Sequence, residues 1–274
     1  MTQKTRSYPF VKWAGGKRQL LPQMEKYFPK HYNRYIEPFI GGGAVFFHLI
    51  PENSIISDDN PDLINCYKVI KDDVESLIKS LKKHIYEKIY YYEIRALDRD
   101  VKKFAELSDI EKASRSIFLN KTGYNGLYRV NSKGLFNVPF GRHKNPKICD
   151  ETNLRNVSQA LKKVEIFLGT FEICLDFVEK DDFIYFDPPY FPLSDTALFT
   201  SYTKNSFDKS SQLKLFEVFM ELNERGCNLM LSNSYSEFIL DLYKDFKIIT
   251  LKAKRNINSN SQKRGLINEV LILN

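Results

Sequence analysis

The stretch at residues 33–50, NRYIEPFIGGGAVFFHLI, constrains the fold more than any other part of the chain. Its first apolar residues, its three successive glycines and the apolar run that follows predict a short strand, a turn and a helix that begins near Ala44. Residues 54–60, SIISDDN, predict a second short strand that ends in acids. Strands that alternate with helices in this way are typical of an α/β fold with a doubly wound sheet.

The C-terminal half continues this alternation. Its patterns predict strands within 164–171, 181–190, 227–234, 246–254 and 268–274, and a helix over 210–225 that Gly226 ends. A basic polar loop, residues 255–265, separates the last two of these strands.

The region between the two halves has a different character. Residues 61–99 place apolar side chains at steps of three and four, which predicts amphipathic helical structure, and residues 111–122 predict a further helix. Residues 123–146 are rich in Gly, Asn and Pro, with basic residues between aromatic ones, and Asn-Ser-Lys-Gly at 131–134 is a good hairpin turn. We therefore predict that residues 62–165 form an inserted second domain.

Composition sets limits on partners and compartment. The 274 residues, 43% of them apolar, suffice for one substantial core and a smaller domain. The 41 basic and 34 acidic residues give a net charge of +7, which permits a polyanionic partner without requiring one. The four cysteines show no metal-ligand spacing, and no apolar run has the length of a signal peptide or a membrane span. We expect a cytoplasmic protein with reduced thiols, no metal site and no membrane attachment.

The glycine turn and the acid after the next strand each have two interpretations. Three glycines at 41–43 let a backbone approach a ligand closely, but alone they favour an ordinary tight turn. Asp58 stands where nucleotide sites place a ribose-binding acid. Alternatively, Asp58, Asp59 or Asn60 caps the helix that begins at Pro61. The interval from the glycine turn favours ribose binding.

The segment FVKWAGGKRQLL, residues 10–21, joins the chain's only tryptophan, Trp13, to a Gly-Gly turn and two cations. Trp13 is suited to pack against an aromatic or sulfonium-bearing ligand, and Lys17 is suited to pair with a carboxylate. A solvated turn before a helix is an equal alternative, although it does not explain the tryptophan.

A buried strand that ends in DPPY contains the strongest chemical motif. Asp187 and the backbone carbonyl of Pro188 provide two acceptors, which suit an exocyclic amine with two N–H groups. Pro188 and Pro189 stiffen this turn because proline fixes φ and removes a donor. Tyr190 supplies a face on which a planar base can stack. A purely structural bend would not account for the carboxylate.

These pieces, in this order, resemble the Dam-type DNA adenine-N6 methyltransferases nearly from end to end. The N-terminal motif of that family stands here as KWAGGK, its cofactor motif as EPFIGGGAVFF and its catalytic motif as DPPYFPLS. A family-specific stretch, NKTGYNGLYRVNSKGLFNVPFGRHKNP, lies between the last two. This order is the class alpha arrangement.

The resemblance implies a Rossmann-like methyltransferase sheet with an inserted, mainly helical target-recognition domain. Residues 1–61 and 166–274 are then the catalytic domain, and residues 62–165 recognise the DNA target. The resemblance also implies S-adenosyl-L-methionine as methyl donor, with S-adenosyl-L-homocysteine as product. The cofactor-binding positions of the family map onto Trp13 and Lys17 at the methionine end, Asp58 at the ribose, Phe39 and Gly41 in the cofactor loop, and Asp187.

The resemblance also implies a double-stranded DNA partner. The base-reading positions map onto Tyr124, Asn125, Leu127, Arg129 and Pro139, and Lys12 matches a further DNA-contacting position. Arginine can contact guanine O6 and N7 together in the major groove, which is the role expected of Arg129. Family members with this segment methylate adenine in GATC. Two positions depart from the pattern: His143, where relatives often carry Tyr, and Thr170, where some carry an acid.

The implied mechanism is a direct methyl transfer without a metal. Asp187 and the Pro188 carbonyl accept both hydrogens of an adenine amine that has flipped out of the duplex, and Tyr190 stacks on the base. Alternatives are an amino methyltransferase acting on RNA, a protein amide or cytosine N4, many of which carry Asn or Ser in place of Asp187. A DNA-binding module with an inactive pocket is another. The enzyme would act alone or beside a cognate restriction endonuclease.

Overall fold

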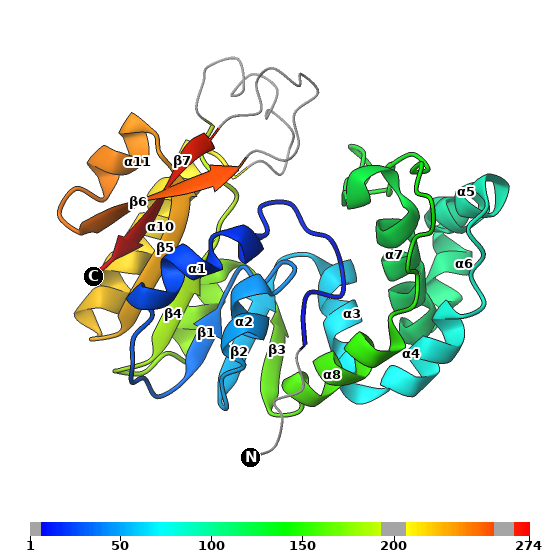
Figure 1. Ribbon diagram of the computed structural model, residues 1–274, viewed down its shortest axis with the longest axis horizontal. Coiled ribbons are helices and arrows are strands. Elements are labelled where there is room, and N and C mark those ends of the chain that lie inside the picture. The colour runs from blue at the N-terminus through cyan, green and yellow to red at the C-terminus, as the bar shows by residue number, and fades with distance from the viewer. Residues whose placement is uncertain (1–6, 193–206, 255–265) are drawn as a thin grey trace. The chain divides into compact units, whose positions relative to one another are not determined.

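The computed structural model describes residues 7–192, 207–254 and 266–274 (Figure 1). Its strands form one seven-stranded sheet in the order β3-β2-β1-β4-β5-β7-β6. This confirms the predicted α/β fold with a Rossmann-like methyltransferase sheet and a helical insertion. The predicted basic loop at 255–265 and the last two residues of the DPPYFPLS motif lie outside the described residues. None of the described helices has the length and apolarity that crossing a membrane requires.

The chain divides into two compact units, which we name by their content. The helical unit comprises Met1–Gly16, Gly41–Ile50 and Asp58–Leu168, and the sheet unit comprises Lys17–Ile40, Pro51–Ser57 and Gly169–Asn274. The chain passes from the helical unit to the sheet unit after Gly16, within KWAGGK, and back to the helical unit after Ile40, within EPFIGGGAVFF. The division into a catalytic domain and a DNA-recognition domain, residues 62–165, concerns function and stays a prediction.

The sheet unit combines parallel and antiparallel pairing. Its strands are β1 (Tyr35–Glu37), β2 (Ser54–Asp58, whose last residue belongs to the helical unit), β4 (Phe183–Phe186), β5 (Asn228–Ser234), β6 (Lys247–Lys254) and β7 (Leu266–Leu273). β1 pairs in parallel with β2 and β4, and β4 pairs in parallel with β5. β7 runs antiparallel to both β5 and β6.

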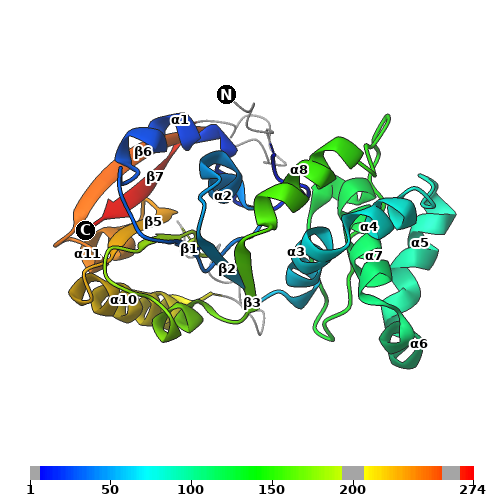
Figure 2. The same cartoon turned by 90° about the horizontal axis from the view of Figure 1, so that it is seen from below.

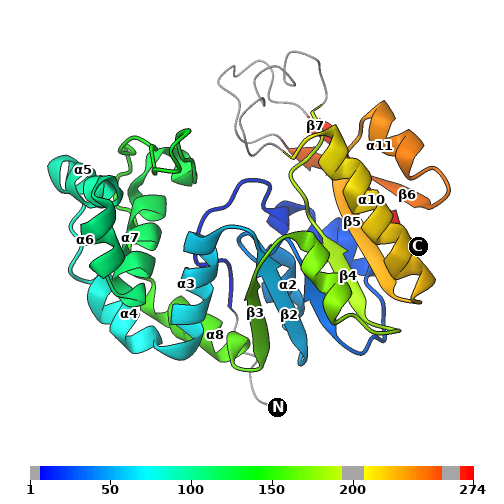
Figure 3. The same cartoon turned by 180° about the vertical axis from the view of Figure 1, so that it is seen from behind.

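Helices cover both faces of the strands in the sheet unit. Figure 1 shows α1 (Leu21–Met24) in front of these strands, and the view from behind shows α10 (Lys209–Glu224) on the opposite face (Figure 3). A further short helix, α11 (Glu237–Leu242), follows β5. Every residue of β4 is buried, which agrees with a central strand covered on both faces.

Most of the described helices belong to the helical unit (Figure 2). They are α2 (Ala44–Leu49), α3 (Pro61–Asp72), α4 (Val74–Leu81), α5 (Lys88–Ala96), α6 (Val101–Glu106), α7 (Asp109–Thr122) and α8 (Glu151–Leu161), and β3 (Val164–Leu168) follows them. The amphipathic pattern over residues 61–99 is not one helix. Asp73 has φ −147° and its side chain accepts a hydrogen bond from the Ser76 amide, so α3 ends and α4 begins there.

Candidate active site and nucleic-acid interface

The carboxyl end of β4 presents a buried ion pair. Asp187 follows the strand directly, and its Oδ1 lies 2.7 Å from the Nζ of Lys17, whose side chain is 3% exposed. Burial raises the pKa of Asp187, the Lys17 ammonium opposes that rise, and the nearby Glu269 carboxylate adds to it. The structure therefore brings together Lys17 and Asp187, two residues that the sequence analysis placed in different motifs.

Tyr190 belongs to the same cluster. Its hydroxyl donates a 2.7 Å hydrogen bond to Oε2 of Glu269 on β7, and the Lys17 ammonium lies 4.6 Å from the centroid of its ring. A cation at that distance from an aromatic face is attracted to it. Lys17, Asp187, Tyr190 and Glu269 thus form one charged group at the end of the parallel strands, where open α/β sheets bind ligands.

Two buried amides hold the backbone on either side of Tyr190. The side chain of Gln212, on α10, donates from Nε2 to the Pro189 carbonyl at 3.0 Å. The Oδ1 of Asn233, on β5, accepts from the Phe191 amide at 3.2 Å, and its Nδ2 donates to Gln212 Oε1 at 3.0 Å. The sequence analysis missed Gln212, Asn233 and Glu269. A polar residue inside an otherwise apolar strand is the pattern that could have indicated the last two.

Phe39 lies in an aromatic group of the sheet unit. Its ring stacks on Phe171 with centroids 5.4 Å apart and an interplanar angle of 24°, and it meets Phe207 edge-on at 5.6 Å. Thr170, one of the departures from the family pattern, donates from its hydroxyl to Glu172 at 3.3 Å. These rings provide flat apolar surfaces of the kind that bind a heteroaromatic base.

In the helical unit, the glycine turn and Asp58 interact directly. The Gly41 amide donates to Asp58 Oδ2 at 3.0 Å, and the Asn60 amide donates to Asp58 Oδ1 at 3.0 Å. Burial raises the pKa of Asp58 to about 6, and these two hydrogen bonds limit the rise. Asn60 caps α3 by accepting from the Leu63 amide. Helix capping is thereby assigned to Asn60, which leaves Asp58 available for another role.

Trp13 is a packed residue as well as a candidate ligand contact. Its indole stacks on Tyr128 with centroids 5.4 Å apart. It also lies so close to Gly41, which has φ +46°, that a Cβ there would come within 2.7 Å of the indole Cδ1. Residues 14–16 form an exposed turn before the 3-10 helix Lys17–Gln19, as the alternative expected, and the tryptophan at its start packs against the glycine turn from one side.

Four of the predicted base-reading residues are exposed on the helical unit, whereas Leu127 is partly buried against the cluster around Tyr91. A 3-10 helix, Tyr124–Gly126, begins this surface, and within this helix Asn125 adopts φ +55°. Tyr124 is 53% exposed, and its amide donates to the Pro139 carbonyl at 2.9 Å. The side chain of Lys12 lies against Gly126, where a Cβ would come within 2.4 Å of the Lys12 Cδ.

Asn120 explains how a residue as distant in sequence as Lys12 joins this surface. Its Oδ1 accepts from the Lys12 amide at 2.8 Å, and its Nδ2 donates to the carbonyls of Lys12 and Gly126 at 2.8 and 3.0 Å. The sequence analysis did not identify Asn120, which lies in the last turn of α7. The structure thus groups Lys12 with Tyr124, Asn125 and Pro139.

Arg129 is exposed and oriented by a neighbour. Its Nε donates to Asn137 Oδ1 at 2.7 Å and its Nη2 to the Asn137 carbonyl at 3.3 Å. The chain reverses between the two residues at the predicted turn 131–134, where the Gly134 amide donates to the Asn131 carbonyl and Gly134 has φ +76°. Nη1 of Arg129 makes no hydrogen bond with any residue that the structure describes, and the residue is exposed.

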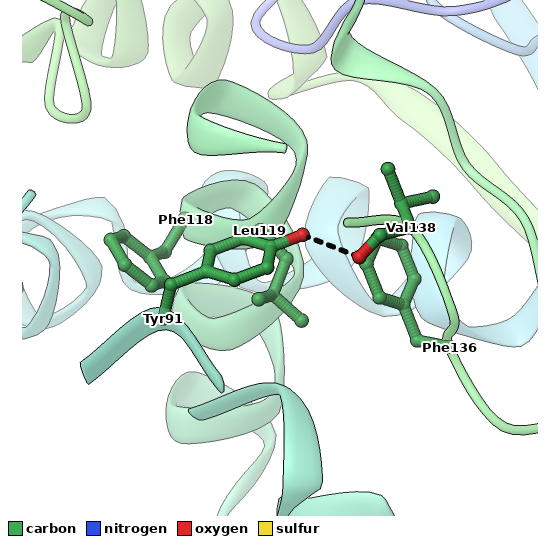
Figure 4. Packing of buried hydrophobic residues seen from close by; sticks show 5 residues of the cluster. All are labelled: Tyr91, Phe118, Leu119, Phe136 and Val138. Atoms are coloured by element: carbon green, nitrogen blue, oxygen red, sulfur yellow. Dashed lines mark hydrogen bonds between the residues drawn. The ribbon is translucent and has the colours of Figure 1, made fainter. Parts of the chain in front are cut away.

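A buried cluster of aromatic and aliphatic side chains packs against the predicted recognition segment. Tyr91 of α5 packs with Phe118, Leu119, Phe136 and Val138, and its hydroxyl donates to the Val138 carbonyl at 2.9 Å (Figure 4). All five side chains are 5% exposed or less. The predicted base-reading segment is therefore mounted on a close-packed support and is not an isolated loop.

His143, the second departure from the family pattern, closes the base of this segment. Its Nε2 lies 3.1 Å from the Gly123 carbonyl, so Nε2 carries the hydrogen, and its amide donates to the Tyr86 hydroxyl at 2.7 Å. Tyr86 in turn donates to the Gly141 carbonyl at 2.6 Å. His143 thus makes internal hydrogen bonds within the helical unit.

A basic cavity of about 550 Å³ adjoins this segment within the helical unit. The described residues that line it are dominated by cations and include no acid: Lys12, Lys121, Arg142, His143, Lys144, Asn145, Pro146 and Lys147. Such a concentration of positive charge is suited to the phosphates of a nucleic-acid backbone.

Comparisons with known proteins assign the family. The family model for D12 class N6 adenine-specific DNA methyltransferases matches residues 13–257. The chain is 49% identical to the type II methyltransferase M.MjaIII of Methanocaldococcus jannaschii, over 97% of this chain and 98% of that protein. It is 46% identical to the type II methyltransferase M1.LlaDCHI of Lactococcus lactis subsp. cremoris, over 97% and 95%, and 33% identical to the DNA adenine methylase of Escherichia coli K12, over 96% and 94%. The chain belongs to the D12 class N6 adenine-specific DNA methyltransferases.

Proposed function

We propose that this enzyme transfers a methyl group from S-adenosyl-L-methionine to N6 of adenine within GATC in double-stranded DNA. The observation that carries the proposal is the pair of acceptors at the end of β4. Asp187 Oδ1 is paired with Lys17, but no described residue donates to Asp187 Oδ2 or to the Pro188 carbonyl. Two adjacent acceptors to which none of the described residues donates suit the two N–H groups of an adenine amine.

The residues present fit the proposed methyl donor in chemical type. The sheet unit offers the stacked rings of Phe39 and Phe171 for an adenine ring and the Lys17 ammonium for a carboxylate. The helical unit offers the Asp58 carboxylate, which is ionised above pH of about 6 and can accept from ribose hydroxyls. Bound S-adenosylmethionine would supply an electrophilic methyl group on a sulfonium. Trp13 and Gly41 would shape the donor's surroundings in the helical unit.

The chain's own groups would act on the adenine amine. The lone pair of N6 is delocalised into the ring, which makes the nitrogen a weak nucleophile. Hydrogen bonds from N6 to Asp187 Oδ2 and to the Pro188 carbonyl favour a pyramidal nitrogen with a localised lone pair. The rigid Pro188–Pro189 turn keeps both acceptors in place before the base arrives, so their effect is one of alignment and electrostatics.

Extrusion of the adenine from the duplex costs a few kcal/mol, and Tyr190 would offset part of it. Its ring is partly exposed beside Asp187, and stacking of a base on an aromatic ring contributes ~1–3 kcal/mol. The buried ion pair places the Lys17 ammonium 4.6 Å from the centroid of this ring, so a base would stack on the opposite face.

The proposed GATC specificity rests on the recognition segment, which resembles that of Dam-type enzymes. Arg129 would contact a guanine through Nη1 and through the second hydrogen of Nη2, whose other hydrogen bonds the Asn137 carbonyl. Tyr124, Asn125, Leu127 and Pro139 would read neighbouring bases. Lys12 and the cations of the basic cavity would bind the backbone.

We further propose that the enzyme serves a restriction-modification system, with a cognate restriction endonuclease that acts on the same site. The support is its similarity to two proteins named type II methyltransferases. Methylation of every GATC site would then protect the host DNA from that endonuclease.

Digestion of treated plasmid tests the proposal. A plasmid free of adenine methylation is incubated with the enzyme and S-adenosylmethionine, and is then cut by nucleases that differ in sensitivity to methylated GATC. We expect resistance to the nuclease that methylated GATC blocks and new sensitivity to the nuclease that requires it. Unchanged cutting by both, together with methyl incorporation at another sequence, would refute the GATC assignment while leaving the family unaffected.

A further inference from the structure

We propose that Glu269, Gln212 and Asn233 are positioning residues that hold Tyr190 as a preformed stacking surface for the extruded base. Glu269 fixes the hydroxyl end of the ring, and the two amides fix the peptide groups on either side of it. The inference rests on the proposed function, because it assumes that Tyr190 stacks on the target adenine.

The backbone side of this arrangement is a closed ring of hydrogen bonds. The Pro189 carbonyl accepts from Gln212, Gln212 accepts from Asn233, and Asn233 accepts from the Phe191 amide, at distances of 3.0, 3.0 and 3.2 Å. Each amide uses both its oxygen and its nitrogen, so its orientation is determined by the ring itself. Gln212 and Asn233 are 0% exposed, and buried polar side chains with all partners in place hold one conformation.

The side-chain end of Tyr190 is held by a rigid strand. Glu269 pairs with Ser234 of β5 on one side and Leu251 of β6 on the other, so its backbone lies in the middle of a ladder. Its carboxylate accepts from the Tyr190 hydroxyl at 2.7 Å. Burial and the carboxylates of Asp187 and Glu269 raise the pKa of Tyr190 well above its usual range, so the hydroxyl keeps its proton and remains a donor.

Preorganisation explains why a stacking residue would be fixed so thoroughly. A side chain that is already immobile loses little conformational freedom when the base binds, and a preformed stacking face therefore favours the extruded state. Neither a cofactor contact nor a base contact is required of Glu269, Gln212 or Asn233 for this role.

Variants of Glu269 and Tyr190 test the inference with a duplex that carries 2-aminopurine at the target adenine. Fluorescence of the probe reports base extrusion, and kcat/KM is measured in parallel on the normal duplex. Glu269→Ala is expected to reduce both by about tenfold, because it frees the ring. Glu269→Gln keeps an oxygen acceptor and is expected to retain most of the fluorescence. Asn268→Ala, on the exposed side of the same strand, is the matched control.

The decisive comparison is a double-mutant cycle. If Glu269 acts through the tyrosine hydroxyl, Glu269→Ala combined with Tyr190→Phe loses no more than Tyr190→Phe alone. Losses that multiply, or Glu269→Ala with the wild-type fluorescence, would overturn the inference. Gln212→Met tests the backbone side, and a folded variant with wild-type extrusion would overturn that part.

The same experiment separates this inference from the proposed function. A wild-type enzyme that fails to methylate GATC contradicts the proposed function. A wild-type enzyme that methylates GATC and extrudes the probe, beside a Glu269→Ala variant that does both equally well, contradicts the inference alone.

Discussion

Replacement of Lys17 by methionine removes a positive charge that lies 2.7 Å from the Asp187 carboxylate and keeps a side chain of similar length. The Lys17 side chain is 3% exposed, so water cannot take its place easily. Removal of one partner from a buried ion pair costs ~3–5 kcal/mol. Asp187 is 19% exposed, which favours the lower end of that range. At 1.36 kcal/mol per pH unit, ~3 kcal/mol corresponds to a rise of about two units in the pKa of Asp187.

Burial already raises this pKa, and the Glu269 carboxylate acts in the same direction. We therefore expect the acid limb of the kcat profile to move about two pH units upward in Lys17→Met, with activity recovering at alkaline pH. The assay is methyl incorporation into a GATC duplex over a range of pH. Saturating S-adenosylmethionine removes any effect of Lys17 on donor affinity, and Lys17→Arg is the control because it keeps the charge.

A Lys17→Met enzyme that loses activity equally at every pH would refute this reasoning. Lys17 would then act on the donor or on the fold, and its charge would not set the protonation state of Asp187.

Three further predictions concern other parts of the molecule. Arg129→Ala should reduce discrimination at one guanine by ~1–3 kcal/mol, measured as the ratio of kcat/KM on GATC to that on a duplex altered at that base, and equal losses on both would identify a phosphate contact instead. Affinity for S-adenosylmethionine should fall as pH drops below about 6, where the carboxylate of Asp58 takes up a proton, and calorimetry with Asp58→Asn should show no such dependence. Burial lowers the pKa of His84 to about 4, so the unfolded chain binds a proton between pH of about 6.5 and 4 that the folded chain does not. The free energy of unfolding should fall through that interval by at most about 3 kcal/mol in urea titrations, and a His84→Gln variant that shows the same fall would refute this.

The local elements were largely predictable because they depend on short-range patterns. The strand, glycine turn and helix around Ala44 appear where expected, as does the turn at 131–134. The pattern over residues 61–99 predicted helical structure, which α3, α4 and α5 confirm, but it did not reveal the boundary at Asp73, because apolar periodicity continues across a helix boundary that a capping side chain creates. The sequence left open whether Asp58 or a neighbour caps α3. The hydrogen bond from the Leu63 amide to the Asn60 side chain identifies Asn60 as the cap.

The motifs of the candidate site were predictable from the sequence, but the residues that hold these motifs in place were not. Asp187 and Tyr190 stand in a recognisable sequence, whereas Glu269 and Gln212 reach them from strands and helices that follow much later in the chain. Which side chains meet at the end of a strand depends on tertiary pairing, and a single sequence carries no record of it. Trp13 illustrates the same limit, since its packing on Tyr128 follows from the fold of the helical unit.

The most direct test of the central claim is a single-turnover measurement of methyl transfer by Asp187→Ala on a GATC duplex. The variant is compared with the wild type by its melting temperature and its extrusion of 2-aminopurine, which show that it folds and binds DNA. The account predicts a folded, DNA-binding variant without detectable formation of N6-methyladenine. A rate near that of the wild type would contradict it, because the adenine amine would then be activated without the carboxylate at the end of β4.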